Sequence, residues 1–384
     1  MKIPLSWLQL THEKMRLAVA LAGIAFADIL MFIQLGFKNA LFDSSVRLHN
    51  SLQGDIFILH TKTDSLVGGR SFSSRRLYEV MGIEGVKNVS PLYINVTDWK
   101  NPETKGSRRI FVVGVNPVNN LFTLSGVEEI LPIIKQPDVI LFDAKSRAEF
   151  GPIKKQFESG ETVKTEIGNR RIQVGGLFEL GGSFGADGTV ITSDVNFFRI
   201  FPNRSKGLID VGVIQVEPTA DVNAVYQTIK DKLGTNKDVQ VFTKAGLVQH
   251  ERNYWEKRTT IGFIFGLGTA MGFIVGTVIV YQILYTDVAD HLPEYATLKA
   301  MGYGDNYLLM VVFQEALLLA VIGFLPSLGI SMLFYANTAR ATGLPLIMTV
   351  SRATTVLILT MIMCTISGAI AVGKLRAADP ADIF

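Results

Sequence analysis

The chain is poor in cysteine and has no strong excess of charge of either sign. Its one cysteine among 384 residues is Cys364, so no disulfide can form within the chain and cysteine usage leaves the redox compartment open. The 37 basic and 34 acidic side chains nearly cancel, to give a net charge of +3. This balance does not predict nucleic acid as a partner, because nucleic-acid binding needs a basic surface.

Patterns of catalytic residues are also scarce. The five histidines show no HExxH spacing and have no cysteine partners, which argues against a zinc site. They are His12, His49, His60, His250 and His291. The glycine-rich segment 175–188 could cradle an anion, but a mobile loop or hairpin is the favoured interpretation. A membrane-anchored enzyme would need a catalytic cluster in 38–258, and we find none there.

The stretch GAIAVGKL at 368–375 has the glycine and lysine spacing of a phosphate-binding loop. That loop requires Ser or Thr after the lysine to help hold magnesium, and here Leu375 follows Lys374. The residues before it form a long apolar run instead of a strand and turn. We therefore expect no ATP, magnesium or other cofactor on this chain, and no enzyme activity of its own.

Long apolar runs account for the 48% hydrophobic content and the mean hydropathy of +0.31. A helix needs roughly 20 apolar residues to cross a bilayer. Four segments meet that requirement, and we expect spans at 17–37, 259–285, 307–335 and 353–373. A signal peptide is the alternative for the first, but its run is long and no cleavage site of small residues precedes Lys38.

Basic residues near the ends of the chain predict its orientation. Lys2, Lys14 and Arg16 flank the first span, and Lys374 and Arg376 follow the last, so the positive-inside rule places both termini in the cytoplasm. The resulting division is a cytoplasmic segment 1–16, an external domain 38–258, a cytoplasmic loop 286–306, a short external loop 336–352 and a cytoplasmic tail 374–384.

The external segment 38–258 predicts an α+β domain. Short β-type runs such as DIFIL, RRIFVVGV, DVILF and RRIQVGGLF are separated by turn residues. Near its end, 210–216, 221–233 and 238–242 predict a strand, a helix and a strand, which form one βαβ-type unit. Both flanks of the segment are compatible with amphipathic helices that continue the spans as stalks.

Polar and small residues mark the expected spans. Asp28 lies within the first span and Glu315 within the third, nearer the cytoplasmic end of that span. A buried acid costs about 2.5–3.5 kcal/mol on insertion scales and usually faces protein or water. For Asp28 a functional and a packing role remain open, whereas packing is favoured for Glu315. Small residues on the second span favour close helix packing, within the chain or across a dimer. They are Gly262, Gly266, Gly268, Gly272 and Gly276.

The loop HLPEYATLKAMGYG at 291–304 predicts a helix of about nine residues. Pro293 suits its first turn, Glu294 and Lys299 complement the helix dipole, and Gly302 suits a left-handed stop. One face would present Tyr295, Leu298 and Met301 or Gly302 as an apolar strip. This strip fits either a helix lying on lipid or a docking helix for a cytoplasmic partner.

At this loop the sequence resembles the FtsX/MacB superfamily of ABC transporter permeases. There a segment E-[FY]-A-x-L-[KR]-A-[ILM]-G lies between the second and third spans and serves as the coupling helix to the ATPase. The matching residues are Glu294, Tyr295, Ala296, Leu298, Lys299, Ala300, Met301 and Gly302. The tail KLRAADPADIF and the opening 23–45 extend the resemblance, which is strongest to DevC-type permeases of cyanobacteria.

The resemblance implies a fold and a set of partners. The fold is four transmembrane helices with a large periplasmic α+β domain between the first two, in a cyanobacterial inner membrane. The partners are a second copy in a homodimer, separate ABC ATPase subunits that carry ATP and magnesium, a periplasmic membrane-fusion adaptor and, indirectly, a TolC-like outer-membrane protein. The implied function is an exporter permease that transmits ATPase motion to its periplasmic domain. The alternative is an FtsX-like signalling scaffold that activates a cell-wall hydrolase.

Overall fold

The computed structural model describes residues 14–183, 185–234 and 238–377, and it divides into two compact units. The first unit holds residues up to Ala40 together with Thr260–Thr342 and the chain from Leu346 onward. The second unit holds Leu41–Thr259 and Gly343–Pro345. Residues 1–13, with Lys2 and His12, and residues 378–384 of the predicted cytoplasmic tail lie outside the described residues.

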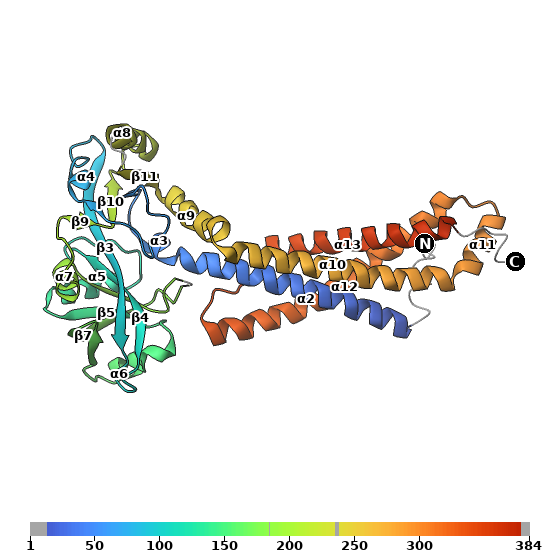
Figure 1. Ribbon diagram of the computed structural model, residues 1–384, viewed down its shortest axis with the longest axis horizontal. Helices are drawn as coiled ribbons and strands as arrows, with labels where there is room; N and C mark the ends of the chain where they lie inside the picture. The colour runs from blue at the N-terminus through green and yellow to red at the C-terminus, as the bar shows by residue number, and fades with distance from the viewer. Residues whose placement is uncertain (1–13, 184, 235–237, 378–384) are drawn as a thin grey trace. The chain divides into compact units, whose positions relative to one another are not determined.

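The first unit consists of long apolar helices and one short helix (Figure 1). They are α2 (Lys14–Ser45), α10 (Thr260–Asp290), α11 (Leu292–Ala300), α12 (Asp305–Thr342) and α13 (Val350–Ala377). Four of them are long and apolar enough to cross a membrane, with α11 the exception. At a rise of 1.5 Å per residue, each of the four exceeds the roughly 30 Å of a hydrocarbon core. The expectation of four apolar helices is confirmed.

Small residues form the centre of this helical unit. Ala20, Ala27, Ala316 and Ala371 are buried there, together with larger side chains such as Met363. Small side chains allow helix backbones to approach closely, which is the usual basis of packing between apolar helices.

The second unit is built on a mixed sheet of nine strands in the order β11-β1-β10-β3-β4-β8-β5-β7-β6. Strand β6 also pairs with the far end of β3, and β2 and β9 form a separate two-stranded sheet. The strands are β1 (Ile56–His60), β2 (Phe72–Ser73), β3 (Val86–Lys100), β4 (Ser107–Val115), β5 (Val139–Asp143), β6 (Lys164–Ile167), β7 (Arg170–Phe178), β8 (Thr189–Ser193), β9 (Leu208–Ile209), β10 (Val211–Val216) and β11 (Val239–Thr243).

Short helices connect these strands. They are α3 (Arg47–Ser51), α4 (Arg75–Tyr78), α5 (Val127–Ile130), α6 (Ile153–Glu158), α7 (Asp194–Ile200), α8 (Val222–Gly234), α9 (Lys244–Asn253), the 3₁₀ helices η1 (Leu131–Lys135) and η2 (Ala148–Phe150), and the π-helix η3 (Tyr254–Arg258). The expected α+β domain is therefore confirmed. The four β-type runs quoted from the sequence correspond to β1, β4, β5 and β7.

The expected βαβ-type unit is present as β10, α8 and β11, but its strands are not neighbours. Strand β1 lies between them and pairs antiparallel with both, so β10 and β11 run parallel with one strand inserted. This is a split βαβ arrangement. Sequence patterns do not reveal the insertion, because β1 lies about 150 residues earlier in the chain.

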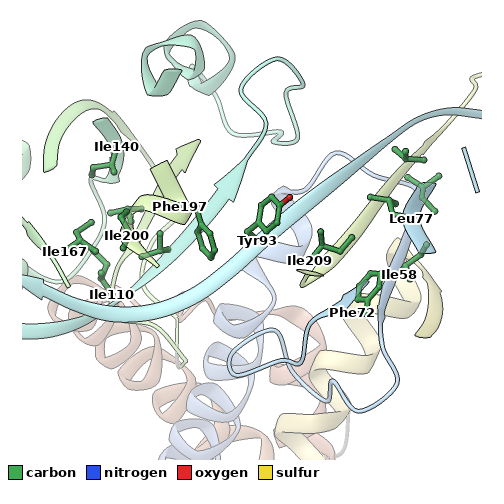
Figure 2. Packing of buried hydrophobic residues seen from close by; sticks show 14 of the residues in the cluster. Ile58, Phe72, Leu77, Tyr93, Ile110, Ile140, Ile167, Phe197, Ile200 and Ile209 are labelled. Carbon is green, nitrogen blue, oxygen red and sulfur yellow. The ribbon is translucent and has the colours of Figure 1, made fainter. Parts of the chain in front are cut away.

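An apolar cluster covers each face of the sheet, and successive side chains along a strand enter the two clusters alternately. On β1, Ile56 and Ile58 enter one apolar cluster, whereas Phe57 and Leu59 enter the other. Figure 2 shows the first cluster spread along the sheet, with Tyr93, Phe197 and Ile209 near its middle. The rigid sheet thus carries loops whose positions are fixed by a core on each side.

The helices next to the unit boundaries differ in continuity. Helix α2 is unbroken to Ser45. By contrast, the helical segment before α10 ends at Arg258, and Thr259 has extended backbone angles (φ −108°, ψ 157°). The stalk expected before the second span is therefore interrupted at Thr259.

Candidate functional site

The helix expected in the loop 291–304 is present as α11, Leu292–Ala300. Gly302 has φ +96°, and the amide of Tyr303 donates to the carbonyl of Leu298 at 3.1 Å. This bond and the left-handed glycine form the closing turn of a Schellman-type cap. The short helix and its glycine stop are confirmed, because both depend on signals local to the sequence.

The surface of α11 differs from the expected apolar strip. Leu298 is half-buried and packs with Leu292 against the buried cluster of Val288, Val312 and Val372. Leu298 therefore attaches α11 to its own helical unit and is not a free anchor. Met301, just beyond the helix, is 63% exposed.

The exposed positions of α11 include Pro293, Glu294 and Thr297. Tyr295, Ala296 and Lys299 belong to the helix, and their side chains lie outside the described part of the chain. Glu294, Thr297 and Met301 are therefore exposed positions at which a partner can contact this region. A helix of nine residues presents a surface of only about 14 Å in length at 1.5 Å per residue.

A group of charged side chains lies where α2 begins and α10 ends, directly before α11. Arg16 forms ion pairs with Asp287, at 3.5 Å from Nη1 to Oδ1, and with Asp290. The ring of His291 contacts the backbone oxygen of Asp287 at 3.0 Å. Glu315 of α12 is 1% exposed, and its carboxyl lies against that of Asp287. These contacts join α2, α10 and α12 at the base of α11.

Sequence reasoning found Glu315 but missed this group. Asp287 and Asp290 fall within the cytoplasmic loop expected at 286–306, and Arg16 served only as an orientation signal. Arg16 and Asp287 are 271 positions apart, and no local sequence pattern links them. Glu315 was the one member of the group that the sequence marked, because an acid within an apolar run is unusual.

Asp28 is fully buried and touches two other helices. Thr360 of α13 donates to its Oδ1 at 2.6 Å, and Ser327 of α12 donates to its Oδ2 at 3.1 Å. Both hydroxyls also reach a carbonyl of their own helix, at 2.8 Å for Thr360 and 2.7 Å for Ser327. The geometry accounts for a buried acid through packing, and a role for its charge stays a prediction.

The glycines of α10 lie in different surroundings. A Cβ atom at Gly276 would stand 2.3 Å from the sulfur of Met363 and 2.6 Å from the Cβ of Ala27, and one at Gly268 would stand 2.5 Å from the side chain of Gln34. Gly272 would meet Met31 at 3.3 Å, whereas Gly266 would meet nothing within 4 Å. Gly262 is buried. Close packing within the chain therefore explains Gly268, Gly272 and Gly276, and Gly266 faces outward.

The two glycine-rich sequence motifs have different outcomes. Gly368 and Gly373 lie inside the continuous helix α13, so the stretch at 368–375 does not form a phosphate loop. In the segment 175–188, the amides of Leu180 and Gly181 each donate at 2.9 Å to the carboxylate of Asp143. The anion held by this segment is thus the protein's own side chain. Burial raises the pKa of Asp143, although the backbone donors and Arg47 act in the opposite direction.

A buried polar network lies in the second unit between α3 and α9. The carboxylate of Glu251 accepts from Ser65 Oγ at 2.6 Å and from the amide of Leu66 at 3.1 Å. It also accepts from the indole of Trp255 at 2.8 Å and contacts His49 Nε2 at 3.2 Å. Burial alone would raise the pKa of Glu251, but the hydrogen bonds from His49, Ser65 and Trp255 outweigh it and lower the pKa below its ordinary value.

This network is not a nucleophile site. The hydroxyl of Ser65 donates to the glutamate and not to the histidine, so the serine–histidine pair of a typical serine nucleophile is not formed. Within the described ranges, no group of three His, Cys, Asp or Glu side chains has metal-binding geometry.

Comparisons with known proteins bear on both units. Residues 261–380 match the family described as FtsX-like permease C-terminal. Among solved structures, the extracellular domain of the noncanonic ABC-type transporter YknZ from Gram-positive bacteria is 16% identical, covers 49% of this chain and 98% of its own, and gives a TM-score of 0.32. The periplasmic region of MacB from Actinobacillus actinomycetemcomitans is 10% identical, with 55% and 98% covered and a TM-score of 0.35.

A domain of a putative permease from Porphyromonas gingivalis is 11% identical, with 51% and 89% covered and a TM-score of 0.31. TM-scores this low do not establish a shared fold. No curated protein matches the chain. The family match rests on the segment that holds α10 to α13, which includes α11 and the charged residues at its base other than Arg16. Residues 261–380 are therefore similar to the C-terminal domain of FtsX-like permeases.

Proposed function

We propose that this chain is the permease subunit of an ATP-driven export system and that α11 is its coupling helix to a separate ATPase. One observation carries the proposal: α11 is a capped, partly exposed helix between two apolar helices, inside the segment that matches the FtsX-like permease family. A short helix of this kind suits insertion into a groove of a partner.

The coupling route that we propose follows from the contacts of α11. Leu298 packs against the helical unit, and His291 and Asp287 connect the start of α11 to Arg16 of α2. A push on α11 by the ATPase would thus act on α2, α10 and α12 together. Helices α2 and α10 are joined along the chain to the residues 41–259, so the external domain would receive the motion.

The further partners belong to the same proposal. ATPase subunits that bind ATP and magnesium would dock at α11 of each copy in a homodimer. A periplasmic membrane-fusion adaptor would contact the α+β unit, and a TolC-like outer-membrane protein would act through that adaptor. The inner membrane of a cyanobacterium, with both chain termini in the cytoplasm, is the proposed location. In the proposed mechanism, the motion of the ATPase is transmitted to the periplasmic domain, which pushes cargo toward the outer-membrane protein.

The first test is affinity purification of the intact chain in mild detergent, followed by identification of co-purifying proteins and an assay of ATP hydrolysis. An ATPase together with an adaptor would support the exporter. An ATPase together with a wall hydrolase and no adaptor would favour the signalling scaffold. An eluate without any ATPase would contradict both functions.

The second test concerns α11 and uses the variant Met301→Asp. We expect the charge to prevent docking and to reduce stimulation of the partner ATPase at least tenfold, because Met301 is 63% exposed beside the helix. Val350→Asp is the matched control, since Val350 is 85% exposed at the first residue of α13 and is expected on the external side. Leu298 is unsuitable because its replacement would also disturb packing. Normal stimulation of the ATPase by the Met301→Asp variant would contradict the assignment of α11 as a coupling helix. It would favour the alternative in which α11 lies on the lipid surface.

A further inference from the structure

A cavity of about 480 Å³ lies in the second unit and has no role in the proposed coupling. Two glycine-containing loops border it, at 65–69 and at 185–187, over the middle of β3 and the start of β4. A Cβ atom on Gly185 would stand 2.7 Å from Val67, so the two loops touch. The volume falls in the range of cavities that hold small organic ligands, roughly 300–1,000 Å³.

The lining of the cavity is apolar at its base. Most of its apolar lining residues belong to the cluster on one face of the sheet and its partly buried neighbours, whereas Ile110 belongs to the cluster on the other face. Those on the first face are Leu66, Val67, Ile94, Val96, Phe111 and Ala186. Such a surface favours a hydrocarbon chain or a ring system, because water leaves it when a ligand enters.

Three of the charged residues at the rim already have partners within the protein. Arg204 and Asp210 pair with each other, and Asp187 pairs with two arginines outside the cavity. Arg204 binds Asp210 at 2.6 Å, and Asp210 also accepts from the amide of Ile94 at 2.7 Å. Asp187 forms ion pairs with Arg108 at 2.6 Å and with Arg147 at 2.9 Å. These side chains shape the rim, and their charges are compensated within the protein.

Arg109 is different. It lines the cavity, its side chain is exposed, and it has no ion pair or hydrogen bond to the residues that the structure describes. Asp98 stands opposite it in the β3–β4 ladder, yet the two do not form an ion pair.

We propose that this cavity binds a small amphiphilic anion: an apolar ring system or single chain that carries one carboxylate, sulfate or phosphate. The apolar base would hold the body, and the guanidinium of Arg109 would bind the anionic group through charge-assisted hydrogen bonds. The proposal goes beyond the proposed function and stands without any ATPase partner.

The test uses the full chain in lipid nanodiscs and titration calorimetry with naphthalene-2-sulfonate, with empty nanodiscs as the reference. Naphthalene-2-sulfonamide is the matched neutral probe, since it keeps the ring system without the charge. We expect saturable binding of the sulfonate to one site per chain and weaker binding of the sulfonamide. Equal binding of the two probes, or no binding of either, would overturn the proposal.

Three variants locate the site. Arg109→Gln should raise the Kd of the sulfonate about tenfold and leave the sulfonamide unchanged, because one hydrogen-bonded charge is lost. Val96→Phe should weaken both probes by filling the apolar base. Arg171→Gln is the matched control, since Arg171 has a side chain 93% exposed and lies outside this cavity. Equal effects of Arg109→Gln and Arg171→Gln would show binding to surface charge in general and overturn the assignment.

Nanodiscs of different composition distinguish the source of the anion. Sulfonate binding that is unchanged when phosphatidylglycerol is added to phosphatidylcholine would support a free small molecule. Sulfonate binding that is lost on that addition, and restored in phosphatidylcholine alone, would support the same cavity with a lipid headgroup as its occupant.

Discussion

Replacement of Glu251 by glutamine should open the region around α3 and α9 locally. The carboxylate accepts three hydrogen bonds from Ser65, Leu66 and Trp255 and contacts His49, while Glu251 itself is 2% exposed. Glutamine has a single acceptor oxygen. If that oxygen takes the position near Ser65 and Trp255, its NH₂ group faces the amide of Leu66; in the flipped position, it faces the indole N–H of Trp255.

One buried donor therefore loses its acceptor in either orientation. A buried donor without a partner costs about 1–3 kcal/mol, and loss of the charge weakens the remaining bonds, so we expect about 2–4 kcal/mol in total. The free energy of local opening can be measured by hydrogen exchange on the full chain, in peptides that cover 61–70 and 246–258. At about 1.4 kcal/mol per tenfold change, exchange should accelerate at least about 30-fold.

The control is Glu179→Gln, because Glu179 pairs with Lys145 on the surface and its side chain is 54% exposed. Its replacement should alter exchange little, since exposed ion pairs contribute about 0–1 kcal/mol. Exchange in the Glu251→Gln variant that stays within threefold of the original protein would refute the reasoning. The network would then be looser than its distances indicate.

The same network predicts a dependence on pH. Since the pKa of Glu251 is lower in the folded chain than its ordinary value of 4.5, its contribution to stability is complete above that ordinary value. The contribution is lost as the pH falls through the lowered pKa, because protonation then removes the acceptor. Protection of the 61–70 peptide should therefore decline on acidification, and a flat profile in the original protein would contradict the assignment.

The other predictions concern packing and buried charge. Asp143→Asn should speed hydrogen exchange in segment 179–183, because one of three backbone amides loses its acceptor at a cost of about 1–3 kcal/mol; unchanged exchange would contradict the anion cradle. Gly276→Ala should destabilise the purified chain in detergent by about 1–3 kcal/mol through overpacking, whereas Gly266→Ala, which meets nothing, should be neutral or slightly stabilising in thermal unfolding. Asp28→Asn should leave stability within about 1 kcal/mol, since both neighbouring hydroxyls keep a carbonyl acceptor. Its transport rate would then show whether the charge itself matters, because an unchanged rate would leave Asp28 a packing residue.

The elements whose signals are local were predictable from the sequence. Helix α11 has a proline at its start and a glycine just past its end, and the long helices contain apolar runs of the length that a membrane span needs. Strands β1, β4, β5 and β7 follow β-type runs between turn residues. In each case the cause lies within a few residues of the effect.

Contacts between distant residues were not predictable. His49 and Glu251 are 202 residues apart, and each is unremarkable within its own segment. The apolar strip expected on α11 also depends on contacts with residues that are distant in the sequence. Periodicity correctly placed Leu298 on an apolar face, but it does not distinguish a face that binds a partner from one that packs against Val288, Val312 and Val372. A cavity such as the one beside Arg109 has no sequence signal at all, because loops from three parts of the chain enclose it.

The shared hydroxyl protons around Asp28 have a consequence for movement within the helical unit. Ser327 and Thr360 each have a single proton and two acceptors in reach, one on Asp28 and one on their own helix. Each hydroxyl can therefore exchange one bond for the other by rotating about its C–O axis, and no buried donor is stranded in between. Neighbouring helices joined in this way can shift past each other by small steps without water entering the interface. Asp28 thus holds three helices together through hydrogen bonds for which each hydroxyl has an alternative acceptor on its own helix.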